Sequence, residues 1–184
     1  MVLLLALSAF VFSVQAQKFS VDKSHSKVGF SVVHLSISDV EGAFKISDAT
    51  LTSSKDDFSD ATFELTADVN TVFTDNDRRD GHLKSADFFD AAKYPTISFV
   101  SKSFKKVADR KYKLVGDLTM HGVTKSVTLD GTLNGTTTNK AGKKIAGFKF
   151  TGTLNRTAFG VGSMPAAVVG EEIELKANGE FIQN

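Results

Sequence analysis

Four histidines are the side chains of this sequence best suited to metal or acid–base chemistry: His25, His34, His82 and His121. No two of them have the short H-x-x-x-H spacing of a ligand pair, and the chain has no cysteine to complete a zinc site. Each lies near the end of a predicted strand or in a turn, where histidine commonly serves as a hydrogen-bonding residue. The sequence therefore predicts no metal site.

A second candidate for chemistry is the charged run 77–80 (DRRD), which is followed by His82. Carboxylates beside an imidazole resemble a general acid–base cluster. Helix capping and charge pairing at the surface explain the same residues more simply. Because the chain also lacks a phosphate-binding loop, a nucleophile elbow and a paired-carboxylate motif, we expect no catalytic residues and no cofactor.

The same charged run opens the stretch 77–99, which interrupts an otherwise alternating sequence. Its apolar residues recur at three-residue spacing, as on one face of a short helix: Leu83, Ala86 and Phe89, with Phe88 beside them. We expect Asp77 to cap this helix and Tyr94-Pro95 to end it, because proline disfavours helical geometry in the residue before it. One helical insert in a chain of strands predicts a cover over one end of a closed sheet.

Elsewhere apolar and polar residues alternate with a period of two, most clearly in residues 61–69 (ATFELTADV). About eight or nine such segments, short turns and almost no proline predict an all-β fold, an antiparallel sheet with one apolar and one solvated face. Closing the sheet removes both hydrogen-bonding edges. We therefore expect an extended barrel of about eight or more strands, with a sandwich as the alternative.

Four glycines interrupt the apolar faces of four predicted strands: Gly116, Gly131, Gly152 and Gly179. Glycine lets strands coil at barrel corners, which is the simpler explanation. Missing side chains would also leave a lumen unfilled, and an eight-stranded barrel is wide enough either to be packed solid or to hold one ligand. We expect the glycines to point inward and to border an elongated apolar cavity, in which a leucine replacing Gly152 would find space.

Composition restricts the class of protein. The 184 residues suit one domain, and the net charge of +1, from 22 basic and 21 acidic residues, argues against a nucleic-acid-binding protein. Residues 2–14 are apolar but too short to span a bilayer comfortably, and a small-residue cleavage pattern ends at Ala16. We expect a signal peptide at 1–16, although it lacks a basic start, and a single exported domain at 17–184 without stable membrane insertion. The sequence leaves a homodimer open.

A series of motifs resembles the YceI-like family, which is also described as lipid- or polyisoprenoid-binding. The matches run from about Phe19 to Ile182: Asp22-x-x-His25-Ser26, Val28-x-Phe30, Gly42-x-Phe44, Arg79-Asp80-x-His82-Leu83, Asp87-Phe88-Phe89-Asp90, Tyr94-Pro95-x-Ile97-x-Phe99, Gly116-x-Leu118-Thr119-x-His121-Gly122 and Arg156-x-x-Phe159-Gly160. The resemblance implies a lipocalin-like antiparallel barrel, an apolar tunnel for a long isoprenoid or similar lipid, and export to a bacterial periplasm or beyond.

The resulting hypothesis is an exported carrier or sequestering protein that binds a long-chain amphiphile. Ten inward-facing apolar residues are expected to line the tunnel: Phe30, Val32, Phe44, Phe63, Leu65, Phe99, Leu114, Leu118, Phe148 and Phe150. Three further residues would form the helical cover: Leu83, Phe88 and Phe89. Three polar residues are candidates for contact with the head group: Arg79, His82 and His121.

Two alternatives stay open at this point. An enzyme acting on a lipid or quinone would need two of His25, His82 and His121 to converge at a pocket. A solidly packed barrel, as in a secreted stress-response or structural protein, would need large side chains opposite all four glycines.

Overall fold

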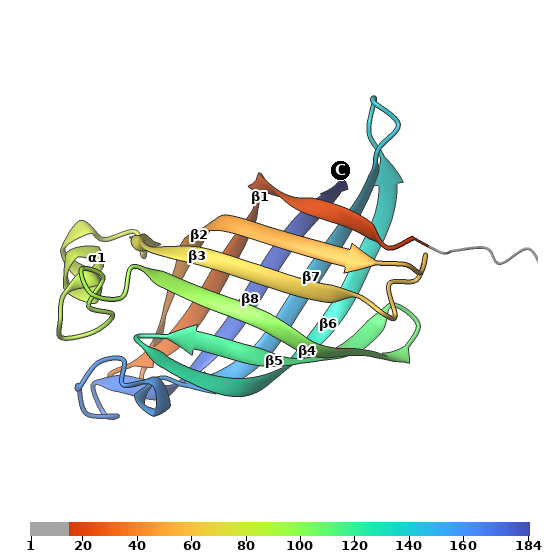
Figure 1. The fold of residues 1–184 in the computed structure, drawn as a ribbon. Helices are drawn as coiled ribbons and strands as arrows, with labels where there is room; N and C mark the ends of the chain where they lie inside the picture. Colours follow the sequence, from red (N-terminus) through yellow and green to blue (C-terminus); the bar gives the residue numbers. More distant parts are fainter. Residues whose placement is uncertain (1–14) are drawn as a thin grey trace, which may run out of the picture.

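The computed structural model describes residues 15–184, so the predicted signal peptide lies almost wholly outside the described residues. These residues form eight strands, one α-helix and one 3-10 helix (Figure 1). In chain order the elements are β1 (Gln17–His34), β2 (Ser38–Ser53), β3 (Thr62–Phe73), α1 (Asp77–Lys84), β4 (Thr96–Ala108), β5 (Lys111–Met120), β6 (Val123–Thr138), β7 (Lys144–Asn155), η1 (Thr157–Phe159) and β8 (Val169–Gln183). Within residues 15–184, no helix combines the length and apolar character needed to cross a bilayer.

The strands form one closed antiparallel barrel in which each strand pairs with the next and β8 pairs with β1. Closure gives every strand two hydrogen-bonded neighbours, so the sheet has no free edge. The predicted barrel with one short helix is confirmed, and the sandwich alternative is wrong. Figure 1 shows α1 at one end of the barrel and the start of β1 at the other.

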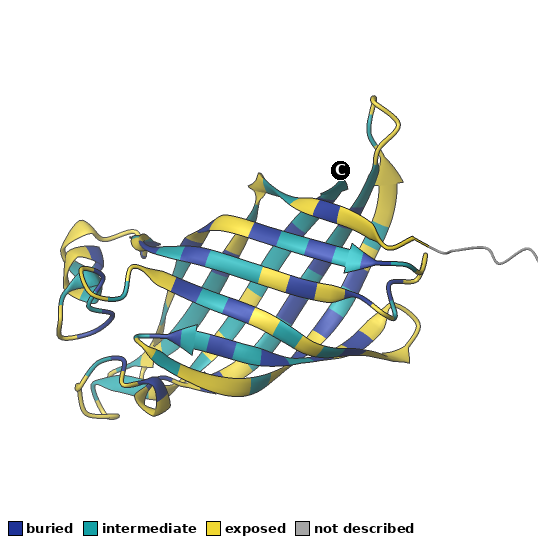
Figure 2. Cartoon of the chain, in the orientation of Figure 1, coloured by how far each residue is buried: buried dark blue, intermediate teal, exposed yellow. Residues whose placement is uncertain are grey.

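The predicted alternation sets which side chains enter the barrel. Along β5 every second residue is buried, from Tyr112 through Leu114, Gly116 and Leu118 to Met120, whereas those between are exposed or half-buried. The pattern of buried and exposed bands repeats around the barrel in Figure 2. Because successive strand side chains point to opposite faces, a period-two sequence buries one complete face of each strand.

A cluster of phenylalanines fills the end of the barrel opposite α1. Phe63 packs edge to face against four other rings, with centroid distances of 5.1 Å to Phe104, 5.3 Å to Phe148, 5.1 Å to Phe150 and 5.9 Å to Phe181. Edge-to-face pairs contribute roughly 0.5–1.5 kcal/mol each beyond the burial of their area. This end of the interior is therefore packed solid.

The helix is shorter than expected. Its N-cap is Asn76, whose side chain accepts the Arg79 N–H at 3.0 Å, so the prediction that Asp77 is the cap is wrong. It also ends before Tyr94-Pro95: Ser85 has an extended backbone and donates its N–H to the His82 carbonyl, which stops the helix at Lys84. Residues 86–94 continue as turns, in which Phe88 and Phe89 are buried but Ala86 is exposed.

The α1 segment is anchored by a buried carboxylate. Asp80 is 6 % exposed and accepts hydrogen bonds from the Thr74 N–H at 2.9 Å and the Thr74 hydroxyl at 2.5 Å. The guanidinium of Arg79 donates to the same threonine, from Nε to Oγ1 at 2.7 Å. These bonds fix the start of α1 against the end of β3, and so position the apolar residues that follow.

The four inward glycines accommodate neighbouring side chains instead of opening the lumen. A Cβ at Gly116 would lie 2.3 Å from Phe99 Cζ and 2.5 Å from the Val100 carbonyl oxygen, and one at Gly152 would lie 2.6 Å from Leu129 Cδ2. A Cβ added at Gly131 or at Gly179 would likewise lie 3.1 Å from a phenylalanine ring atom. The expectation of free space at Gly152 is therefore wrong, because the adjacent strand already fills it.

This packing predicts the effect of adding a methyl group. Gly116→Ala should lower the free energy of unfolding by about 1–3 kcal/mol, because backbone as well as the Phe99 ring must shift. Gly135→Ala is the matched control, since a Cβ there would meet nothing within 4 Å, and its effect should stay within about 0.5 kcal/mol. Urea unfolding of both variants measures the difference; equal stabilities would contradict this account of Gly116.

Candidate functional site

Two apolar cavities lie inside the barrel beyond the phenylalanine cluster. The mouth-end cavity, near α1, measures about 90 Å³, and the inner cavity measures about 80 Å³. Five residues line both cavities, which are therefore adjacent: Val28, Ile97, Leu118, Leu154 and Leu175. A single water needs roughly 10–15 Å³ and several polar partners. Spaces of this size with apolar walls suit an apolar ligand better than water.

The predicted cover closes the mouth-end cavity. Leu83, Phe88 and Phe89 all line it, together with strand residues such as Val32 and Phe44. Phe89 packs edge to face on Phe44 with their centroids 5.2 Å apart. The cover is therefore a helix followed by turns whose two phenylalanines enter the barrel, and not the single helical face that the spacing suggested.

The inner cavity ends at the phenylalanine cluster. Phe63, Phe150 and Phe181 form part of its lining, and the ring of Phe148 packs against all three. The apolar interior therefore runs from the cover to the cluster and is closed at the cluster end.

Nine of the ten predicted tunnel residues line one or both cavities. Those at the mouth-end cavity are Phe30, Val32, Phe44 and Leu118. Those at the inner cavity are Phe63, Leu65, Phe99, Leu114, Leu118 and Phe150. Phe148 lines neither, because it is fully buried within the phenylalanine cluster. None of the four inward glycines lines either cavity, so the expectation that they border the apolar space is also wrong.

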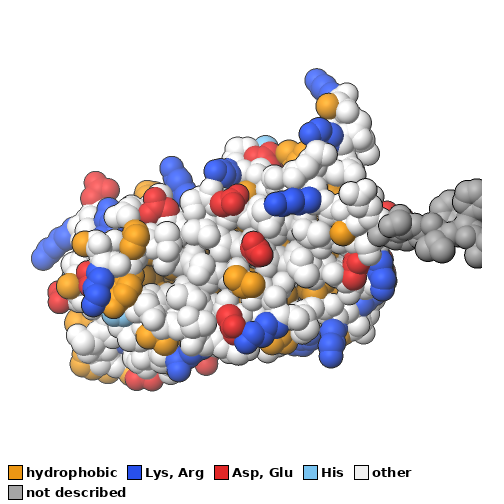
Figure 3. All heavy atoms as spheres, viewed as in Figure 1, with side chains coloured by type: hydrophobic (Ala, Val, Ile, Leu, Met, Phe, Trp, Pro, Cys, Tyr) orange, Lys and Arg blue, Asp and Glu red, His pale blue; other side chains and the backbone are white. Residues whose placement is uncertain are grey.

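A groove of about 190 Å³ lies at the mouth, outside the mouth-end cavity. Arg79 and His82 line it beside Phe30, Leu83 and Phe88, which also line the cavity. Exposed apolar side chains surround this end of the barrel: Leu35, Ile37, Phe73 and Met164. Figure 3 shows hydrophobic side chains reaching the surface there among charges of both signs. Polar groups and apolar surface thus meet at the mouth of the barrel.

Two of the three predicted head-group residues reach this mouth. His82 is exposed, with Nε2 3.3 Å from Asp87 Oδ2 and its ring 5.0 Å from that of Phe88. Arg79 is half-buried and is held by Thr74. His121 lies in the turn after β5, directly after Met120 of the mouth-end cavity, and its ring packs on Tyr94 at 4.7 Å. His121 is thus at the same end of the barrel but does not line the groove.

The histidines do not converge as the enzyme alternative requires. His25 pairs with Asp22 on the outer face, His82 lies at the mouth, and His121 packs on Tyr94. Within residues 15–184, no hydrogen bond joins any two of these three histidines. The geometry therefore provides no acid–base pair at the cavities.

Among the lining residues of the mouth-end cavity that sequence reasoning did not assign, Arg156 is the charged one. It is 3 % exposed, and its Nε donates to the Gly170 carbonyl at 2.9 Å. Its two terminal nitrogens each donate to two more carbonyls, those of Val161, Gly162, Met164 and Val169. Burial lowers the pKa of this guanidinium, but every N–H has a partner. In the sequence, the motif Arg156-x-x-Phe159-Gly160 was the feature that could have drawn attention to this residue.

A closed eight-stranded antiparallel barrel with an apolar interior is an architecture that can enclose one small ligand. Comparison with known proteins agrees with this class. The YceI-like domain matches residues 19–181. A UPF0312 protein of Staphylococcus aureus is 34 % identical over 169 residues, which cover 89 % of this chain and 96 % of that protein. The chain therefore belongs to the YceI-like family, as its motifs predicted.

Solved structures share the fold. The YCEI protein of Campylobacter jejuni is 34 % identical with a TM-score of 0.73, covering 89 % of this chain and 96 % of its own. A polyisoprenoid binding domain from Saccharophagus degradans has a TM-score of 0.62 at 15 % identity, covering 90 % of this chain and 98 % of its own. At that identity the likeness concerns the fold alone.

The bonds of Arg156 predict a structural role. Arg156→Met should lower the free energy of unfolding by at least about 3 kcal/mol, because a buried hydrogen bond to a charged group contributes roughly 1.5–3 kcal/mol and several are lost together. Amide exchange should speed up most in residues 161–170. The control is Arg110→Met, since Arg110 is exposed and its loss should change stability by about 0.5 kcal/mol or less. A similar decrease in the free energy of unfolding in both variants would contradict a structural role for Arg156.

Proposed function

We propose that this protein is an exported carrier that holds the tail of a long-chain, polyisoprenoid-like amphiphile in its barrel. Two adjacent apolar cavities between the cover and the phenylalanine cluster are the main support for this proposal. Each methylene that moves from water into such a space contributes about 0.8 kcal/mol. Ordering the tail offsets part of this gain.

The residues at the mouth suggest the orientation in which the amphiphile would bind. The tail would enter under Leu83 and Phe88 and end against Phe63, while the head group stays outside near Arg79 and His82. The cover is not part of the hydrogen-bonded barrel, so it is the element we expect to move when a tail enters. The ligand class is suggested by the Saccharophagus degradans domain, which is described as binding polyisoprenoid. No observation favours the enzyme alternative over passive carriage.

Filling the junction of the two cavities tests this proposal. Leu118 lines both cavities, so Leu118→Phe should block the inner one and leave the mouth-end cavity open. Affinity for a longer polyprenol should fall about tenfold, the equivalent of roughly two methylenes. Affinity for the shorter farnesol should change less. Titration with a fluorescent competitor measures both affinities, after organic extraction of the purified protein has removed any bound lipid.

The control variant is Val100→Phe, which adds an aromatic ring on the outer face, where Val100 is 52 % exposed. It should leave both affinities unchanged. Equal losses for the two alcohols in Leu118→Phe, or unchanged binding of the longer one, would overturn a tail site that passes through both cavities.

Export is a separate prediction. If residues 1–16 act as a signal peptide, intact-mass analysis of protein recovered from the periplasm or medium should give a chain that begins at Gln17 or close to it. The residues at 14–16 (VQA) motivate this expectation. A protein that retains Met1 in that fraction would contradict it.

A further inference from the structure

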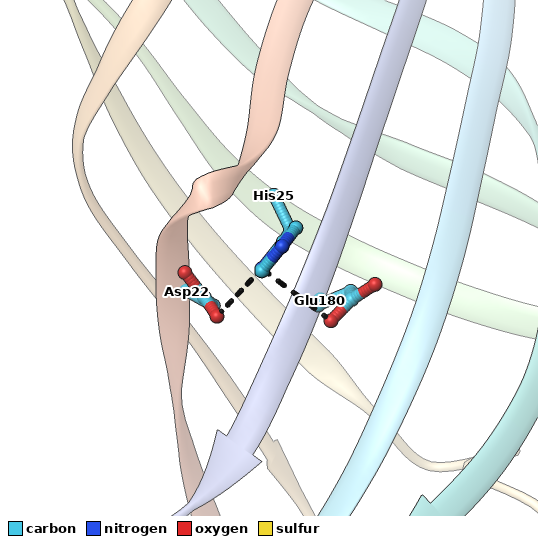
Figure 4. Close-up of side chains that lie close together, drawn as sticks. All are labelled: Asp22, His25 and Glu180. Atoms are coloured by element: carbon cyan, nitrogen blue, oxygen red, sulfur yellow. Dashed lines mark hydrogen bonds and ion pairs between the residues drawn. The ribbon is translucent and has the colours of Figure 1, made fainter.

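Three potential metal ligands from opposite ends of the chain meet on the outer face of the barrel. Asp22 and His25 belong to β1, and Glu180 belongs to β8 (Figure 4). His25 Nδ1 lies 2.9 Å from Asp22 Oδ2 and 3.9 Å from Glu180 Oε2. The ligand atoms of all three residues lie within 4.8 Å of one another.

A bulge in β1 creates this arrangement. Asp22 pairs with Glu180 and Lys27 with Asn178, so β1 contains three more residues than β8 between these two pairs. The extra residues leave the regular ladder, and His25 is among them. Bulges often re-aim a side chain, and here the imidazole reaches back toward both carboxylates (Figure 4).

The two carboxylates are unfavourable neighbours unless a cation accompanies them. Asp22 and Glu180 are directly opposite on antiparallel strands, and like charges in that position destabilise a sheet. A divalent cation bound between them would supply two positive charges against their two negative ones.

Neighbouring serines orient the carboxylate ligands. Ser24 donates its N–H at 2.9 Å and its hydroxyl at 2.6 Å to Asp22 Oδ1, which leaves Oδ2 facing His25. The Glu180 N–H donates to Ser26 Oγ at 3.1 Å, which fixes the backbone that carries the third ligand. Outer hydrogen bonds of this kind position the ligands of metal sites in proteins.

We infer that Asp22, His25 and Glu180 bind one divalent transition-metal cation, with Zn²⁺ as the ion that fits best. One imidazole and two carboxylates are zinc ligands with bonds of about 2.0–2.2 Å, which place tetrahedral ligands about 3.3 Å apart. The distances from His25 to its two partners lie on either side of that value. This site revises the prediction from histidine spacing, because the third ligand comes from the far end of the chain.

The site adjoins a groove on the outer face. His25 and Glu180 line a groove of about 390 Å³ together with Asn134, Thr136 and Asn178. Three protein ligands leave one tetrahedral position open, which water or an oxygen anion can occupy. This groove shares no lining residue with the two apolar cavities, so the metal site does not depend on the proposed lipid carriage.

Calorimetric titration with zinc chloride tests the site on protein that carries no affinity tag and has been treated with EDTA. We expect saturable binding of one equivalent. His25→Gln and Glu180→Gln should each lower the affinity at least about tenfold. His82→Gln is the matched control, because His82 also pairs with a carboxylate, that of Asp87 at 3.3 Å, but belongs to no three-ligand group within residues 15–184. Its affinity should equal that of the wild type.

Two further measurements separate the site from non-specific binding. Imidazole nitrogen NMR should show zinc shifting the His25 signals while those of His82 stay in place. Calcium chloride should compete poorly, since it prefers a larger oxygen shell. Three outcomes would overturn the inference. They are the absence of saturable zinc binding, an equal loss of zinc affinity in His25→Gln and His82→Gln, and calcium binding as tight as that of zinc. Far-UV circular dichroism confirms that each variant is folded.

Discussion

Hydrogen bonding between β1 and β8 is the interaction on which the rest of this structure depends. It joins the first and last strands and turns a sheet with two free edges into a barrel with an enclosed interior. Alternating side chains then have one dry face to fill, which is why apolar residues recur at every second position. The same pairing places Glu180 opposite Asp22, so the ladder that encloses the apolar interior also assembles the polar cluster outside it.

The interior formed by this closure is filled unevenly. Aromatic rings interlock at one end, whereas branched aliphatic residues such as Ile97 and Leu175 surround the cavities nearer α1. Atoms that line a cavity lack contact partners on one side and so lose dispersion energy that a ligand can restore. The packed end supplies stability, and the loosely filled end is where the proposed tail site lies. The inward glycines belong to the packing, since rings such as that of Phe99 occupy the space they leave.

Arg156 shows how a charge can border an apolar cavity without becoming a ligand. Its five N–H donors are all used by backbone carbonyls of the segment 161–170, so none is free for an anion. Removing a buried polar partner costs more than the bond itself contributes, because the remaining groups are left without partners. The arginine therefore holds the loop that walls the cavity, and other polar side chains, those of Arg79 and His82, lie farther out, at the mouth.

The sequence by itself determined the barrel, the inward faces and the family, because period-two patterning is local and the motifs follow one another in order. Nine of the ten predicted lining residues, Leu118 among them, face the cavities for that reason. Only the tertiary structure decided the side-chain contacts between neighbouring strands. The Phe99 ring fills the space beside Gly116, and Glu180 reaches His25 only through strand pairing and a bulge. Spacing along the chain carries no information on such contacts, because the register of strands distant in sequence sets the distances between them.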